Sequence, residues 1–166
     1  PGTAKDIGSV FLAMAIGLAT GMGCIGVGSM GRGDAHGFNG LCDVVAICDM
    51  NPDVRANVQD MLAKSNYECT LYENFEDFLN HDMDAVVLAN FANEHAPFAI
   101  RCMERGLHVF SEVLPCANMK QAVELCEAVE KYGKIYAYGE NYCYFPAMIE
   151  MKKEYRLGKI GEFEYG

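Results

Sequence analysis

Basic residues are scarce in this sequence. Its 166 residues include 13 Lys and Arg against 23 Asp and Glu, which gives a formal net charge of −10. An acidic surface attracts neither nucleic acid nor an anionic membrane, so we expect neither as a partner. The net charge does not exclude an anionic cofactor, because local backbone N–H groups can hold phosphates whatever the total charge.

The sequence also lacks the spacing that metal-binding cysteines and histidines show. No Cys-x-x-Cys pair occurs among the eight cysteines, and the four histidines are scattered along the chain. We therefore expect no metal site. Several cysteines fall inside expected strands or helices, which favours buried, reduced thiols and a cytoplasmic protein.

Internal repeats and low-complexity segments are absent, and one stretch lacks charge altogether. Residues 7–31 carry no charged side chain, but a glycine-rich segment occupies the end of this stretch. The remaining apolar run is shorter than the roughly 20 residues of a membrane span, so no membrane is expected. Three interpretations of residues 1–21 stay open: an apolar leader or extra helix of uncertain origin, a membrane or secretory segment, and an extended first strand.

Short apolar segments alternate with helical patterns along the chain, and 51% of the residues are hydrophobic. This alternation predicts a doubly wound parallel α/β sheet, the Rossmann arrangement, with the strand order 3-2-1-4-5-6. The expected strands are 22–27, 44–48, 69–71, 85–89, 107–111 and 135–138, with another beginning at 163–165. The expected helices are 29–38, one that begins at 51–53, 75–79, 95–105, 118–132 and 146–156. For the helix 118–132, we expect an inner face of Ala122, Val123, Cys126 and Val129.

A glycine motif gives the clearest functional signal. The segment Gly26-Val27-Gly28-Ser29-Met30-Gly31 has the spacing of a dinucleotide-binding turn between a strand and a helix. Asp49 lies 18 residues beyond Gly31 and ends the next apolar segment, near the spacing of about 20 at which an acid binds the adenosine ribose. We predict NAD rather than NADP, because a carboxylate repels a 2′-phosphate and Arg55 is the nearest cation.

Polar side chains also follow the later strands. Asn90 and His95 come after the fourth expected strand, Glu112 after the fifth and Asn141 after the sixth. The carboxyl ends of parallel strands meet at one edge of the sheet, where ligands bind, so we expect these residues near a site. Two alternatives stay open for His95, which either caps its helix or contacts a ligand, and Glu112 is either a site acid or a structural one.

Four segments, taken together, resemble the glucose-fructose oxidoreductase / inositol dehydrogenase (Gfo/Idh/MocA) family: Ile25-Gly-Val-Gly-Ser-Met-Gly-Arg-Gly33, Cys48-Asp-Met-Asn-Pro52, Gly106-Leu-His-Val-Phe-Ser-Glu112 and Gly139-Glu-Asn141. The resemblance implies an NAD(P)-binding Rossmann domain at 22–145, followed at 146–166 by the start of a C-terminal substrate domain that is missing here. Since that second domain supplies much of the oligomer interface, a homo-oligomer is implied for the full-length protein. The chain begins with Pro and stops at Gly166 in mid-pattern, so we interpret it as a fragment.

The resemblance implies an NAD(P)-dependent oxidoreductase that acts on a sugar, a cyclitol or a related polyol, with the isolated fragment inactive. It implies pyrophosphate contacts at 26–31, ribose contact at Asp49, and nicotinamide-side contacts around Asn90, His95, Glu112 and Asn141.

The chain departs from the family in two places. Val113 stands where the family's Glu-Lys-Pro motif has its lysine, and Asn90-Phe91 replaces the usual Thr-Pro. We therefore assign the catalytic role to Glu112. An NAD-retaining binding or sensor protein without dehydrogenase activity stays open as the alternative.

Overall fold

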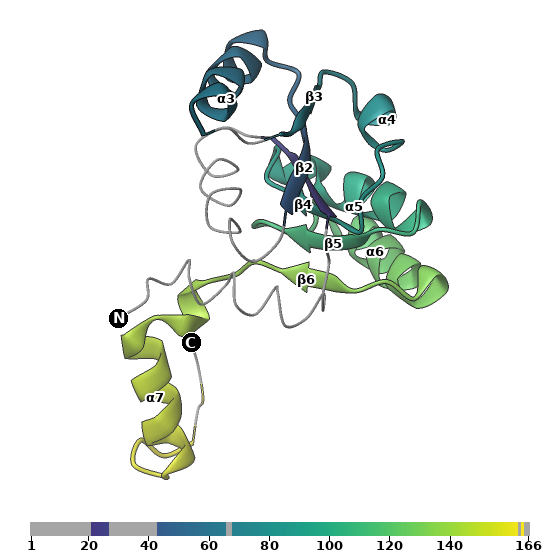
Figure 1. The fold of residues 1–166 in the computed structure, drawn as a ribbon. Helices are drawn as coiled ribbons and strands as arrows, with labels where there is room; N and C mark the ends of the chain where they lie inside the picture. Colours follow the sequence, from purple (N-terminus) through teal and green to yellow (C-terminus); the bar gives the residue numbers. More distant parts are fainter. Residues whose placement is uncertain (1–20, 27–42, 66–67, 163, 165–166) are drawn as a thin grey trace.

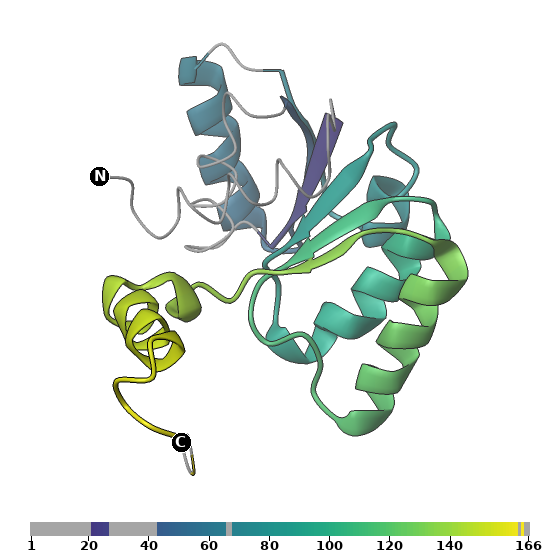
Figure 2. The ribbon, with the colours of Figure 1, turned by 90° about the horizontal axis from the view of Figure 1, so that it is seen from below.

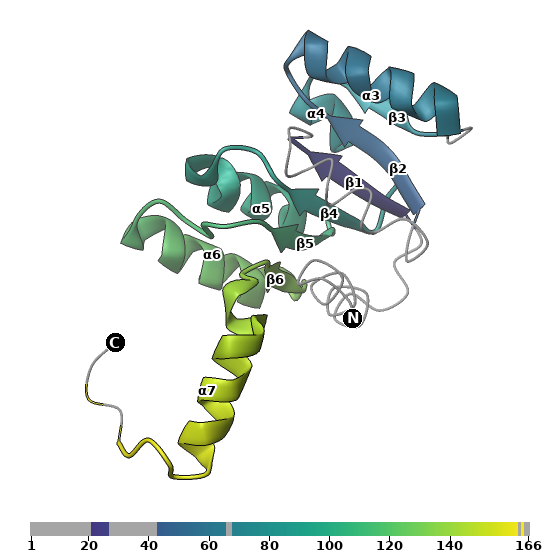
Figure 3. The same cartoon turned by 90° about the vertical axis from the view of Figure 1, so that its left-hand side faces the viewer.

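The computed structural model describes residues 21–26, 43–65, 68–162 and 164. Six strands of these ranges form one sheet in which every neighbouring pair is parallel, in the order β3-β2-β1-β4-β5-β6 (Figures 1 and 3). The strands are β1 (Gly21–Ile25), β2 (Asp43–Cys48), β3 (Thr70–Tyr72), β4 (Ala85–Leu88), β5 (His108–Ser111) and β6 (Tyr136–Tyr138). The predicted doubly wound order is confirmed.

Helices cover both faces of this sheet. The helical elements are α3 (Pro52–Ser65), α4 (Phe75–Phe78), η1 (Ala92–Glu94), α5 (His95–Glu104), α6 (Met119–Tyr132), η2 (Tyr142–Tyr144) and α7 (Pro146–Arg156). One apolar cluster joins the sheet to α4, α5 and α6, and a second joins the opposite face to α3. Figure 2 shows helices on both sides of the sheet. The crossovers therefore wind to both sides of the sheet.

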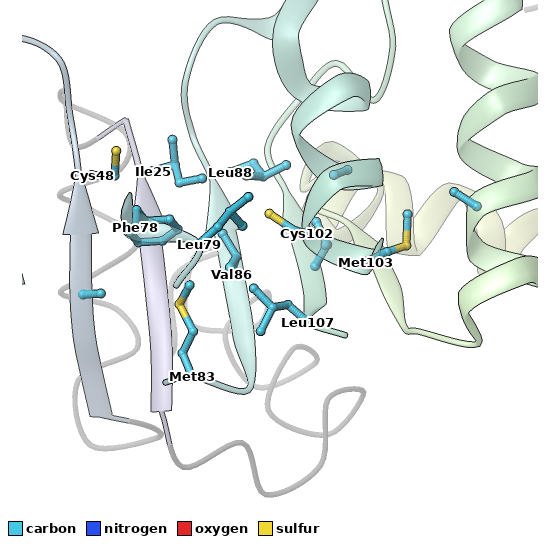
Figure 4. Packing of buried hydrophobic residues seen from close by; sticks show 14 of the residues in the cluster. Ile25, Cys48, Phe78, Leu79, Met83, Val86, Leu88, Cys102, Met103 and Leu107 are labelled. Atoms are coloured by element: carbon cyan, nitrogen blue, oxygen red, sulfur yellow. The ribbon is translucent and has the colours of Figure 1, made fainter. Parts of the chain in front are cut away.

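The core is densest around β4, whose four residues are all fully buried because strands and helices surround them. Phe78 and Met83 pack against the neighbouring strand β1 from the side of α4 (Figure 4). Gly23 permits this contact, since a Cβ at that position would overlap the Phe78 ring and the Met83 sulfur. The glycine is thus a packing residue rather than a flexible point.

The expected helix caps are present. The Asn51 side chain accepts a hydrogen bond from the Asp53 N–H at 2.9 Å, and the Asn118 side chain accepts one from the Gln121 N–H at 3.0 Å. Gln121 returns the contact through its Oε1, which accepts from the Ala117 N–H at 2.7 Å. These bonds satisfy N–H groups that have no partner inside the helix, and at α6 they resemble a capping box in which Gln121 reaches the residue before the cap.

The predicted inner face of α6 is wrong at two of its four residues, Val123 and Cys126. Val123 is 53% exposed and Cys126 is exposed, whereas Leu125 and Ala128 are buried. Ala122 and Val129, the other two expected residues, are half-buried. The helix carries two adjacent apolar stripes, and the sheet and α5 select the one that contains Leu125.

The expectation of buried thiols holds for part of the described cysteines. Cys24, Cys48 and Cys102 are buried, but Cys126 and Cys143 are exposed, and none of the seven cysteines in the described ranges forms a disulfide. Three further predictions fall outside these ranges: the interpretations of residues 1–20, the helix 29–38 and most of the strand start at 163–165. None of the described helices has the length and apolar content that a bilayer span requires.

Candidate functional site

The carboxyl edge of the sheet gathers the site residues that the sequence predicts. Gly26, Asp49, Asn90 and Glu112 each follow a strand within two residues, and Asn141 follows β6 shortly after. Backbone hydrogen bonds continue the strand ladders to this edge, from the Gly26 N–H to the Cys48 carbonyl (3.0 Å) and from the Glu112 N–H to the Leu88 carbonyl (2.9 Å). The loops therefore start from fixed positions.

Gly26 marks a close crossing between the loops after β1 and β4. Its φ is +75°, and a Cβ there would lie 2.6 Å from both the Cα and the backbone nitrogen of Asn90. Only glycine fits such a conformation without strain or overlap. The other residues of the predicted motif, Val27, Gly28, Ser29, Met30 and Gly31, lie outside the described ranges.

Asp49 is oriented by its own neighbours. Its Oδ1 accepts a hydrogen bond from the Asn51 N–H at 2.9 Å. Arg55 donates from Nη1 to the Asp49 backbone carbonyl at 2.7 Å and from Nη2 to Glu73 Oε2 at 3.0 Å, and its side chain is 20% exposed. The one cation that the sequence places near Asp49 is thus already paired with an acid.

The thiol of Cys48, the last residue of β2, is affected by the charge of the neighbouring Asp49. Burial raises the pKa of the neighbouring Cys48 thiol to about 11, with the Asp49 charge as the second cause. The thiol is therefore neutral at physiological pH, and the Asp49 carboxylate is the negative group at the end of this strand.

His95 is almost fully enclosed, with 1% of its surface exposed. Its Nδ1 lies 2.7 Å from the Leu114 carbonyl oxygen, and its Nε2 lies 3.2 Å from the Asn90 carbonyl oxygen. The side chain does not cap α5, since both ring nitrogens face carbonyl oxygens of the loops and not an N–H of the helix. It connects the loop after β4 to the loop after β5 instead.

Asn90 stands at the start of the loop after β4. Its Nδ2 donates to Glu94 Oε2 at 3.2 Å, while its buried Oδ1 has no hydrogen-bond partner within the described ranges. The bond to a carboxylate fixes the assignment of the amide, because the opposite orientation would set two oxygens against each other. Asn90 therefore presents an unsatisfied acceptor beside the Gly26 crossing.

The loop after β5 carries one acid and an exposed apolar pair. Glu112 is half-buried, while Val113 and Leu114 are 41% and 58% exposed, and Phe91 across the edge is 74% exposed. No described lysine or arginine pairs with Glu112. Burial raises the pKa of Tyr138, and the charges of Glu140, Cys116 and Glu112 raise it further.

Asn141 lies just before η2, in a turn that the Glu140 side chain stabilises. Glu140 Oε1 accepts from the Tyr142 N–H at 2.8 Å, and the Tyr142 and Phe145 rings stack at 4.9 Å between centroids. The turn carries the chain from β6 into α7. Nowhere in the described ranges do three His, Cys, Asp or Glu side chains gather as metal ligands would.

Sequence reasoning missed the role of His95 and the exposure of Phe91 and Leu114. The partner of Nδ1 is a backbone carbonyl 19 residues away, so no side-chain pattern marks the contact. The exposed apolar residues do carry a signal, because each lies three residues beyond a strand end, where few apolar residues are needed for the core.

The family model described as "Oxidoreductase family, NAD-binding Rossmann fold" (GFO_IDH_MocA) matches residues 20–140. A "Glycosyl hydrolase family 109 protein" of Shewanella pealeana is 29% identical over 87% of this chain and 34% of its own length. An "Inositol 2-dehydrogenase/D-chiro-inositol 3-dehydrogenase" of Lactiplantibacillus plantarum is 27% identical over 86% of this chain and 41% of its own length.

Solved structures show the same fold. The myo-inositol 2-dehydrogenase of Lactobacillus plantarum superposes with a TM-score of 0.78 at 22% identity, over 88% of this chain and 43% of that one. The WlbA dehydrogenase of Bordetella pertussis, solved with NADH and UDP-GlcNAcA, gives 0.75 at 22% identity, over 85% of this chain and 42% of that one. The chain thus spans less than half the length of these relatives.

Proposed function

The chain belongs to the Gfo/Idh/MocA oxidoreductase family, and on that basis we propose that it is the NAD-binding part of a dehydrogenase for a cyclitol or a sugar. The observation that supports this most is the pairing of Gly26 and Asp49 at adjacent strand ends. A positive-φ glycine beside a neighbouring backbone, with an acid after the next strand, is the arrangement that a dinucleotide requires.

The residues present fit an NAD molecule. Gly26, where a Cβ would overlap the Asn90 backbone, permits the tight turn after β1, and the segment 27–31 continues the motif, whose second glycine would let a pyrophosphate approach the backbone. Asp49 would accept from the adenosine ribose hydroxyls. Arg55 is held by Glu73 and by the Asp49 carbonyl, so it is poorly placed to neutralise a 2′-phosphate, which favours NAD over NADP.

The nicotinamide half would lie over β4, β5 and β6, because each half of this fold binds one nucleotide. NAD, when bound, supplies the hydride chemistry. Asn90, Glu112 and Asn141 stand at the ends of these strands to orient the nicotinamide and the substrate, with His95 between them. Glu112 would hold the proton of the reacting hydroxyl, since Val113 offers no amine for that task.

A carbohydrate-like substrate is supported by the names of the relatives. One relative is an inositol dehydrogenase by name, and others are glycosyl hydrolases by name. Glycoside hydrolysis is therefore a second candidate activity, and the missing amine beside Glu112 fits a reaction other than simple alcohol oxidation. Without either activity, the chain would be an NAD-retaining binding or sensor protein.

A longer protein is part of the proposal. The helix α7 has no buried residue and extends away from the sheet (Figure 3). We place the Rossmann domain at 22–145 and the start of a substrate domain at 146–166, which agrees with relatives more than twice as long as this chain. The homo-oligomer and the cytoplasmic location belong to the same proposal.

Calorimetric titration of the chain with NAD and NADP tests the cofactor assignment. We expect tighter binding of NAD, and a loss of about 10- to 100-fold in Asp49→Asn, because a hydrogen bond to a charged group contributes about 1.5–3 kcal/mol. Asp53→Asn, at the start of α3, is the matched control and should leave the affinity unchanged. Equal or tighter binding of NADP would overturn the assignment.

The activity is tested on the full-length protein with inositols, free sugars and aryl glycosides. Formation of NADH with an inositol or a sugar supports the dehydrogenase. Release of the aryl group without net NADH supports the hydrolase. Binding of NAD with neither reaction supports the sensor.

A further inference from the structure

His95 is one of only two polar or charged side chains that are buried in the described ranges, the other being Ser111. The Ser111 hydroxyl makes a local bond to the Glu112 carbonyl at 3.0 Å. His95, in contrast, joins residues that are far apart in the sequence, with the Asn90 carbonyl on one side and the Leu114 carbonyl on the other. A buried imidazole between two loops requires an explanation.

The two contacts of the ring differ in length. A carbonyl oxygen only accepts, so a hydrogen bond to it needs an N–H of the ring. The shorter contact, 2.7 Å from Nδ1 to the Leu114 oxygen, is a hydrogen bond donated by Nδ1, while Nε2 lies 3.2 Å from the Asn90 oxygen. The strong bond of His95 is therefore to the loop after β5, while its own backbone belongs to the helix that follows the loop after β4.

This contact ties together loops that are otherwise independent. The last ladder bond between β4 and the segment after β5 runs from the Glu112 N–H to the Leu88 carbonyl. Beyond it, the contact of His95 Nδ1 with the Leu114 carbonyl is the only hydrogen bond in the described ranges that connects residues 89–95 with residues 113–117. The separation of the two loops therefore depends on this ring.

The two loops carry the residues that would face the nicotinamide. Asn90 and Phe91 lie on one loop, and Glu112, Val113 and Leu114 lie on the other. The ring itself is 1% exposed and would not touch a ligand. We propose that His95 is a positioning residue of the cofactor site, which sets the gap between the β4 and β5 loops and thereby the affinity for the nicotinamide half of NAD. The inference rests on the proposed NAD-binding function.

Calorimetry with NAD and with ADP-ribose isolates this effect, because ADP-ribose lacks only the nicotinamide. The dissociation constant of ADP-ribose divided by that of NAD measures how much the nicotinamide contributes to affinity. We expect His95→Phe, which keeps a ring and removes both nitrogens, to lower that ratio about 10-fold, the equivalent of roughly one hydrogen bond. Binding of ADP-ribose should change less than about twofold, since its contacts lie over β1 and β2.

Two further variants separate positioning from general stability. His95→Asn places an amide N–H near the position of Nδ1 and should restore most of the ratio, whereas His95→Gln reaches toward Nε2 and should not. His108→Phe is the matched control: His108 lies at the start of β5, at the opposite edge, where its Nδ1 accepts from the Ile135 N–H at 3.0 Å. That change should lower the melting temperature and leave the ratio unchanged.

The outcomes are distinct. An unchanged ratio in His95→Phe, or an equal loss for NAD and ADP-ribose, overturns the inference and leaves the proposed function intact. If His95→Phe does not fold, the comparison of His95→Asn with His95→Gln decides, and equal ratios in these two overturn the inference. A wild-type chain that binds neither ligand overturns the proposed function itself.

Discussion

At the scale of single residues, the site depends on backbone geometry as much as on side-chain chemistry. Gly26 and Gly133 both have positive φ angles, +75° and +61°, but they differ in what surrounds them. A Cβ at Gly133 meets nothing within 4 Å, whereas a Cβ at Gly26 meets the Asn90 backbone at 2.6 Å. An alanine at Gly133 would therefore have only the strain of the left-handed conformation, whereas an alanine at Gly26 would also overlap a neighbouring loop.

We expect Gly133→Ala to lower the free energy of unfolding by about 1 kcal/mol, the cost of a left-handed conformation for alanine. Gly26→Ala adds overlap with a neighbouring loop and should cost about 1–3 kcal/mol more, together with a loss of NAD affinity. Urea unfolding of both variants measures the difference. Equal destabilisation of the two would show that the crossing at Gly26 is looser than the structure describes.

Some residues of the site could be predicted from the sequence and others could not. Gly26 and Asp49 could be predicted because a spacing rule connects them. The role of His95 could not, because its partners are backbone carbonyls that any residue offers. The pairing of Arg55 with Glu73 could not be predicted either, because the two residues are 18 positions apart in the sequence.

At the scale of elements, the strand order and most helix bounds could be predicted, because apolar runs, caps and glycines mark them. The orientation of α6 about its axis could not. Two apolar stripes with the same spacing lie side by side on this helix, and only the position of the sheet and α5 decides between Leu125 and Val123. Tertiary packing, not local pattern, chooses the buried face.

This choice gives a prediction for α6. Leu125→Ala should lower the free energy of unfolding by about 2–5 kcal/mol, because it removes a buried side chain and leaves a cavity. Val123→Ala, two residues away on the exposed stripe, should change it by less than about 0.5 kcal/mol. Chemical denaturation compares the two. A larger effect at Val123 would restore the face that the sequence predicts.

At the scale of the whole molecule, the cysteines report on global unfolding. Burial raises the pKa of Cys102 to about 12 and that of Cys48 to about 11, so these thiols are neutral as well as inaccessible. Cys126 and Cys143 are exposed on α6 and η2. A thiol reagent therefore distinguishes the surface from the core.

We expect Cys126→Ser/Cys143→Ser to remove two equivalents of fast labelling from the native chain at pH 8. Cys102→Ala should leave the fast phase unchanged and reduce the number of thiols that react only in denaturant. Absorbance of the released thiolate measures both phases. Rapid reaction of Cys102 in the native chain would contradict its burial on the side of α5 that packs into the core.

The order of the sheet places its two shortest strands at the outside. β3 and β6 have three residues each, whereas the four strands between them have four to six. An outer strand exposes unpaired N–H and C=O groups to which a strand of another molecule can add, and a short one offers few of them. Growth of fibrils by strand addition is therefore disfavoured while the fold is intact, and aggregation should begin from molecules in which an outer strand has detached.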